Sequence, residues 1–192
     1  MKLDIQYFSK QFKVTYLKKE DLTKILPLCE SNPLYYKHFP PMVSVQSILD
    51  DMEALPLNKK KEDKYYIGFW NEDSLIAMMD LINAYPDEES AWIGFFMVDQ
   101  KYANKGVGTS IIEDVSNYLR IRYNYIRLAY VEENKQCAHF WKKNNFIYDE
   151  NNCLLEEQAF YAEEKIYAYY YEYNNFIDIL SNTEHVPIPF QP

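Results

Sequence analysis

The sequence predicts an α/β fold in which helices flank a mixed β-sheet. Short apolar runs rich in β-branched and aromatic residues alternate with segments whose apolar residues recur at helical spacing. Between residues 93 and 119, a strand, a glycine-containing turn and a helix follow one another directly. A length of 192 residues suits one domain with a sizeable core. We expect residues 1–173 to form this domain, and residues 174–192 to be a tail of the same domain or an interface arm.

The first half of the chain is expected to supply three strands and two helices. The predicted strands cover residues 12–17, 65–70 and 74–83, and the last two form a hairpin. The predicted helices cover residues 19–30, kinked at Pro27, and residues 45–55, capped by Ser44. The connections are expected to be an aromatic-rich loop over residues 31–41 and a charged, solvated turn over residues 59–64.

The second half is expected to alternate strands with helices before ending in strands. The predicted strands cover residues 93–98, 125–131, 146–148 and 165–173, and the predicted helices cover residues 107–119 and 135–144. No internal repeat and no second domain is visible in this order of elements.

Two of the four glycines, Gly106 and Gly108, stand in the turn that leads into the helix over residues 107–119. Glycine lets backbone amides approach a ligand closely, and a helix N-terminus favours a phosphate. The turn is not a Walker loop, because Lys105 precedes the glycine, and it is not a dinucleotide fingerprint, because Ile111 stands where a third glycine is needed. An ordinary strand-to-helix turn remains the alternative.

The turn resembles motif A of the GCN5-related N-acetyltransferases (GNAT), which bind acetyl-coenzyme A. In that family a strand ending in Val is followed by Gln/Arg-x-x-Gly-x-Gly/Ala at a helix start. Val98, Gly106 and Gly108 match this pattern. The Gln/Arg position is Ala103, which departs from the family, and the glycine that often follows is Asn104, a residue that tolerates left-handed backbone.

A second motif resembles the same family further along the chain. The family often shows Asn-x-x-Ala/Ser-x-x-x-Tyr-x-x-x-Gly-Phe after its fifth strand. Here the positions hold Asn134, Cys137, Trp141, Asn145 and Phe146, so Trp replaces Tyr and Asn replaces Gly. The two motifs have the expected order and separation, and together they cover residues 67–146.

The resemblance implies a mostly antiparallel sheet of six to seven strands with about four helices, splayed between strands four and five around acetyl-CoA as co-substrate. The backbone of Phe96, Met97 and Val98 would pair with the pantetheine arm, and a backbone N–H near Val98 would face the thioester oxygen. The residues implied to hold the pyrophosphate are Lys105, Gly106, Val107, Gly108, Thr109 and Ser110. Asn134 and Trp141 would flank the thiol end.

Proton removal from the amine requires a base. Some family members carry a glutamate early in the fourth strand, but this position is Trp92. Asp80 is our preferred candidate, because a carboxylate within an apolar strand is costly unless it is paired or functional. The other candidates are Glu88, Glu89, Glu132 and Glu133, and a structural carboxylate satisfied by nearby tyrosines is the alternative for Asp80.

Proton donation to the leaving thiolate is the step at which the chain departs from the family. Trp141 cannot donate a usable proton in place of the family's tyrosine. Cys137 could replace it, although a small apolar packing role suits this residue better. His139 is expected to be exposed, and His38 is a weak candidate for contact with the acceptor.

Composition narrows the possible partners. The net charge of −9 argues against nucleic acid and favours a cationic amine such as a polyamine, an aminoglycoside or a peptide, although solubility alone would also explain it. No apolar run approaches the roughly 18 residues of a membrane span, and the N-terminus lacks a signal peptide's apolar core.

The three cysteines are scattered, without metal-ligand spacing. We therefore expect a cytoplasmic N-acetyltransferase without a metal, and we leave open a homodimer. The alternative is a catalytically weak module of the same fold that binds an acyl-CoA as a sensor or interaction partner.

Overall fold

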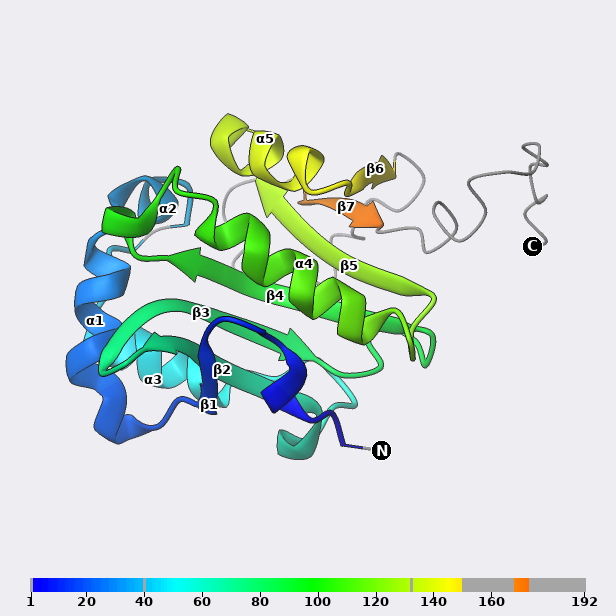
Figure 1. Cartoon of the computed structure of the whole chain (residues 1–192), viewed down its shortest axis with the longest axis horizontal. Helices are drawn as coiled ribbons and strands as arrows, with labels where there is room; N and C mark the ends of the chain where they lie inside the picture. The colour runs from blue at the N-terminus through cyan, green and yellow to red at the C-terminus, as the bar shows by residue number, and fades with distance from the viewer. Residues whose placement is uncertain (1, 40, 132, 150–167, 173–192) are drawn as a thin grey trace.

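Seven strands form a single sheet in the computed structural model, which describes residues 2–39, 41–131, 133–149 and 168–172. The strand order is β1-β2-β3-β4-β5-β7-β6 (Figure 1). The strands are β1 (Lys13–Tyr16), β2 (Lys64–Asn71), β3 (Ser74–Ile82), β4 (Ser90–Val98), β5 (Tyr125–Val131), β6 (Ile147–Asp149) and β7 (Ala168–Glu172). Every neighbouring pair is antiparallel except β4 and β5, which confirms the predicted mixed, mostly antiparallel sheet.

Helices cover both faces of this sheet (Figure 1). They are α1 (Leu22–Glu30), α2 (Pro33–His38), α3 (Val45–Glu53), α4 (Val107–Leu119) and α5 (Lys135–Lys143). Short 3-10 turns precede or join them: η1 (Ile5–Tyr7), η2 (Lys19–Asp21), η3 (Lys61–Asp63) and η4 (Gln100–Tyr102). In the described part of the chain, none of the helices has the length and apolar character needed to cross a membrane.

Two hydrophobic clusters lie on opposite faces of the sheet because side chains alternate along each strand. On one face, α4 contributes buried Ile111, Val115 and Leu119 at helical spacing. On the other face, α1 and α3 contribute buried residues that include Ile25 and Ile48. The chain therefore builds a three-layer arrangement with the sheet in the middle.

The sheet splays between its two parallel strands, as the resemblance predicts. β4 pairs with β5 only where Ser90–Ile93 faces Tyr125–Leu128. Figure 1 shows the two strands diverging beyond this point. A bulge lies at the divergence, because Leu81 faces Ile93 whereas Asp80 faces Phe95, which leaves Gly94 as an extra residue. The second half of β4 therefore has an edge that β5 does not cover.

The structure corrects two expectations about the connections. Residues 33–38 of the predicted loop form α2, because Pro33 at the first helical position has its φ angle already set and needs no N–H acceptor. Lys64 belongs to β2, not to a solvated turn, and its side chain is only 6% exposed. The predicted last strand is present as β7, whereas the tail over residues 174–192 lies outside the described residues.

Candidate functional site

The start of α4 presents uncapped backbone N–H groups to open space. Gly106 is the N-cap, with a left-handed φ of 80°, and no side chain among the described residues caps the helix. The first helical hydrogen bond runs from Ser110 N to Gly106 O at 2.9 Å, so the N–H groups of residues 107–109 precede the helical ladder. A Cβ built at Gly106 would meet no atom of the described part of the chain within 4 Å. This helix start can therefore receive an anion.

Gly108 contributes differently, through close packing. A Cβ at Gly108 would lie 3.1 Å from Cε2 of Phe140 on α5 and 3.4 Å from Cγ2 of Val98 on β4. An added Cβ would therefore push on the Phe140 ring by a few tenths of an ångström, and glycine allows the close approach without such a shift. The two glycines of the motif thus open the helix start and hold it against β4 and α5.

Two lysines flank the same turn but differ in their surroundings. Lys101 Nζ lies 3.1 Å from Asp99 Oδ2, and Asp99 Oδ1 also accepts a hydrogen bond from Lys101 N at 3.0 Å. Lys105 is exposed, with its Nζ 6.0 Å from the centre of the Tyr102 ring. Lys105 is therefore the charge beside the helix start that an anionic ligand can use.

The free edge of β4 carries the backbone groups of Phe96 and Val98. Asp99 N donates to Ile76 O of β3 at 2.9 Å. Because backbone groups alternate along a strand, Met97 also faces β3, whereas Phe96 and Val98 turn their N–H and C=O groups the other way. Phe96 and Val98, rather than Met97, thus face the side of β4 where a ligand could lie, although Val98 O already accepts a hydrogen bond from Asn32 Nδ2 at 3.0 Å.

Helix α5 closes the region from the other side. Asn134 is its N-cap, and its Oδ1 accepts a hydrogen bond from Cys137 N at 3.0 Å. Trp141 is 5% exposed, and its ring lies 6.1 Å from Phe96 and 4.9 Å from Phe146 between ring centres. The fold therefore brings the residues of both motifs together around the end of β4.

The remaining candidates for proton donation or for contact with the acceptor are poorly suited to these roles. Burial raises the pKa of the Cys137 thiol to about 11, so the thiol stays protonated and is a reluctant proton donor. His139 is exposed on α5, as expected from the sequence, and His38 ends α2. Neither histidine is among the residues that surround the β4 edge in the contacts described above.

Asp80 lies on the opposite face of the sheet and is paired. Its Oδ2 accepts a hydrogen bond from Lys64 Nζ at 2.7 Å, and the two side chains are 16% and 6% exposed. Its Oδ1 is buried without a hydrogen-bond partner among the described residues. Burial raises the pKa of the Asp80 carboxyl, while Lys64 opposes this shift.

Aromatic rings border the same face of the sheet. Tyr35 of α2 meets Phe95 edge-on with ring centres 5.3 Å apart, and it stacks on Phe39 at 5.1 Å. Tyr66 of β2 lies beneath Lys64, whose Nζ is 5.6 Å from the ring centre. The Tyr66 ring and the Asp80 carboxylate thus already contact one ammonium group, that of Lys64, on this face of the sheet.

The candidates for the general base differ in their distance from Val98 along the strands. Asp80 faces Phe95, three residues before Val98, which corresponds to roughly 10 Å along β4. This separation exceeds direct proton transfer, so Asp80 would need intervening water. Glu88 and Glu89 precede the other end of β4, far from Val98. Glu133 is exposed, and Glu132 lies outside the described residues.

Sequence reasoning missed two charged residues of this face, Lys64 and Asp51. The charged run over residues 59–64 predicts a solvated turn for Lys64, whereas strand alternation with Tyr66 places Lys64 on the face of Asp80. Asp51 follows buried Ile48 by three positions, so α3 turns it toward the sheet. Asp51 as a whole is exposed to solvent, but its carboxyl is partly desolvated. This desolvation raises the pKa of the carboxyl to about 6; the charge of Lys64 opposes the shift, and the charge of Asp80 adds to it.

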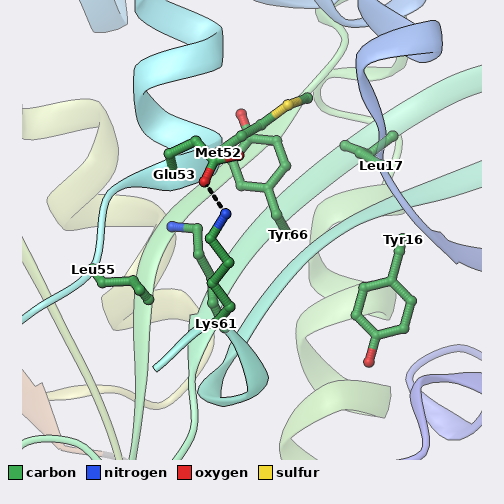
Figure 2. A pocket seen from close by; sticks show the side chains of 8 residues that line it. Tyr16, Leu17, Met52, Glu53, Leu55, Lys61 and Tyr66 are labelled. Carbon is green, nitrogen blue, oxygen red and sulfur yellow. Dashed lines mark hydrogen bonds and ion pairs between the residues drawn. The ribbon is translucent and has the colours of Figure 1, made fainter. Parts of the chain in front are cut away.

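A shallow cavity of about 170 Å³ adjoins this charged group. Lys64 and Tyr66 line it together with residues of β1 and of the end of α3, and a hydrogen bond joins Lys61 to Glu53 at its rim (Figure 2). A second cavity, of about 480 Å³, lies between β1, α1 and the β2–β3 turn. Neither cavity includes the start of α4 or the end of β4.

Comparison with known proteins identifies this arrangement. A model of the acetyltransferase (GNAT) family matches residues 28–146. An acetyltransferase from Thermus thermophilus has a similar fold, with a TM-score of 0.67 and 12% identity over 84% of this chain and 96% of that one. A comparison with curated proteins gives no significant match.

Two further structures of similar fold have more informative names. The PaiA N-acetyltransferase from Thermoplasma acidophilum, in complex with coenzyme A, has a TM-score of 0.58 and 15% identity over 84% of this chain and 99% of that one. A spermidine N-acetyltransferase chimera of Vibrio cholerae SpeG and hSSAT has a TM-score of 0.58 and 18% identity over 85% of this chain and 94% of that one.

Proposed function

The chain belongs to the acetyltransferase (GNAT) family, and on this premise we propose that it transfers the acetyl group of acetyl-CoA to a primary amine of a cationic small molecule or peptide. The observation that carries the proposal is the convergence of two free sets of backbone groups. The uncapped start of α4 and the free edge of β4 meet beside α5. A diphosphate and an extended amide-bearing arm need such a pair of sites.

On the co-substrate side, the N–H groups of Val107, Gly108 and Thr109 would hold the pyrophosphate, and Lys105 adds a positive charge. The N–H and C=O of Phe96 and the N–H of Val98 would pair with the pantetheine arm as an added strand does. Acetyl-CoA supplies the thioester. The Val98 N–H would stabilise the negative charge that develops on the thioester oxygen.

On the acceptor side, the face with Asp80 and Asp51 would receive the amine in a ternary complex. Two carboxylates and one buried ammonium, Lys64, leave this group with an excess negative charge when Asp51 is ionised. The rings of Tyr35 and Tyr66 would contact the carbon chain of the acceptor. Holding amine and thioester in contact supplies much of the catalysis, because it removes the entropy cost of a bimolecular step.

Asp80 is the proposed acceptor of the amine proton, working through water because of the roughly 10 Å that separate it from Val98 along the strands. The thiolate is a good leaving group and needs no donor, which is consistent with Trp141 in place of the family's tyrosine. The raised pKa of Asp80 favours proton uptake at this site.

A specific observation favours the alternative of an acyl-CoA sensor. Asp80 is held by Lys64 at 2.7 Å, so its lone pairs are partly committed to an ion pair. A thiol-release assay over polyamines, aminoglycosides and peptide amines, combined with calorimetry of CoA binding, separates the two functions. Acetyl transfer to any amine supports the enzyme. Binding of acetyl-CoA without thiol release for the whole panel supports the sensor.

A further inference from the structure

The junction between α1 and α2 reaches across to the end of β4 through Asn32. Asn32 Nδ2 donates to Val98 O at 3.0 Å, and it also lies 3.0 Å from Leu28 O of the preceding helix α1 and 3.0 Å from Ser31 Oγ. The neighbouring Ser31 Oγ accepts a hydrogen bond from Gln100 N at 3.1 Å and donates to Leu28 O at 2.7 Å. Two adjacent side chains therefore tie this junction to residues 98–100.

The contact with Val98 matters because of where that carbonyl points. Val98 turns its backbone groups away from β3, toward the edge that β5 leaves free. The Asn32 amide occupies the carbonyl at the last residue of this edge. A ligand that pairs along β4 thus finds the groups of Phe96 and the N–H of Val98 available, and meets the Asn32 side chain at the next position.

Asn32 also connects this edge to the acceptor face. It is the N-cap residue of α2, and three residues further along that helix Tyr35 packs on Phe95 of β4. Helix α2, which borders the acceptor face, is therefore fixed relative to the edge of β4 by two contacts, one at Val98 and one at Phe95. A movement of this junction would shift both at once.

We propose that Asn32 is a positioning residue that fixes the register of the thioester on β4, by occupying the Val98 carbonyl and so directing the ligand's last hydrogen bond to the Val98 N–H. The proposal rests on the proposed function. Without the amide, the Val98 carbonyl becomes free to pair with the pantetheine arm, and the thioester oxygen loses its alignment with the N–H. Asn32 itself need not touch the reacting atoms.

The variant Asn32→Ser tests the idea, because serine is also favoured at N-cap positions but is too short to reach Val98. Ser31→Ala is the matched control, since it removes the hydrogen bonds of Ser31 Oγ to Gln100, Leu28 and Asn32 Nδ2 while leaving Asn32 Nδ2 within reach of Val98 O. For each protein we would measure CoA affinity by calorimetry, turnover with the best acceptor, and the carbonyl stretching band of ¹³C-labelled acetyl-CoA in the complex.

We expect wild type and Ser31→Ala to shift the carbonyl band to lower frequency on binding. Asn32→Ser should lose most of this shift and about 10- to 100-fold of kcat, somewhat less than the loss of an oxyanion-hole donor itself, with CoA affinity changed less than about threefold. If a folded Asn32→Ser protein shows the wild-type carbonyl band and the wild-type kcat, this inference is wrong, while the proposed function is unaffected. Failure of the wild type to bind any CoA species would overturn the proposed function and this inference with it.

Discussion

Lys64 and Asp80 form a buried ion pair across the β2–β3 hairpin, with Nζ and Oδ2 separated by 2.7 Å. The pair couples the stability of the sheet to the chemistry proposed for its acceptor face. Desolvating both charges is expensive, and the buried Oδ1 of Asp80 has no hydrogen-bond partner among the described residues. The pair is therefore better explained by function than by a contribution to stability.

Asp80→Asn should destabilise the protein, because it leaves the Lys64 ammonium buried without its counter-charge. We expect a loss of about 3–5 kcal/mol in the free energy of unfolding, measured by denaturant titration. The double variant Lys64→Met/Asp80→Asn should recover most of this loss, since no buried charge remains. If the single and double variants are equally stable, the ion pair is not the cause.

The same double variant separates folding from catalysis. With a working acceptor, it should remain folded and lose about 10²-fold or more in turnover, the usual contribution of a general base. Asp73→Asn, in the exposed β2–β3 turn, is the control for removing a carboxylate and should keep wild-type turnover. Full turnover in the folded double variant would remove Asp80 as the proton acceptor.

Asp51 should make acceptor binding depend on pH near neutrality. Its carboxyl has a pKa raised to about 6, so it gains its charge as the pH rises through that value. The KM for a cationic amine should therefore fall between about pH 5 and pH 7, and Asp51→Asn should flatten this profile. Asp50→Asn neutralises the adjacent carboxylate on α3 and should keep the pH dependence with only a small shift to lower pH, because Asp50 is the smallest of the influences on the pKa of Asp51.

Stability should show the opposite dependence on pH. Between the ordinary value of 3.8 and about 6, folded Asp51 holds a proton that the unfolded chain has released. The free energy of unfolding therefore falls as pH rises through this window. Thermal melting of Asp51→Asn should exceed that of wild type at pH 8, and the two should converge below pH 4. A constant difference at all pH values would contradict the raised pKa.

Gly106→Ala should weaken CoA binding through the backbone. A left-handed φ of 80° costs a residue with a side chain about 1 kcal/mol, although the space around the added Cβ is open. We expect a loss of stability of that size and weaker CoA binding in calorimetry, because the amides of the helix start shift. Gly106→Asn should be milder, since asparagine tolerates this conformation. Equal losses in Gly106→Ala and Gly106→Asn would show that the left-handed backbone conformation is not the cause.

Lys105→Ala should weaken CoA binding and should make the affinity for CoA less dependent on salt concentration. The exposed ammonium beside the α4 start is free to attract phosphate, an attraction that salt screens. We expect about a threefold to tenfold loss of affinity at low salt that shrinks as salt is raised. Lys101→Ala is the control, because that lysine is paired with Asp99. An equal loss in both variants would indicate a general effect of net charge.

The strand, turn and helix around residues 93–119 could be predicted from the sequence because their signals are local. Residues 125–131 are likewise β5 as predicted, and Ser44 caps α3 as predicted, with its Oγ accepting a hydrogen bond from Ser47 N. Short-range rules of this kind depend only on neighbours along the chain. The family, the mixed sheet and its splay followed from the two motifs, whose spacing is also a property of the chain.

Only the tertiary structure decided which groups face one another across elements. Asp80 was recognised as an unusual buried carboxylate, but its partner Lys64 became visible only once the hairpin register placed both on one face. Asn32 and Val98 are 66 positions apart, and no local pattern marks a hydrogen bond between them. Such contacts depend on how layers pack, because burial and the geometry between elements, rather than sequence spacing, determine which polar groups find a partner.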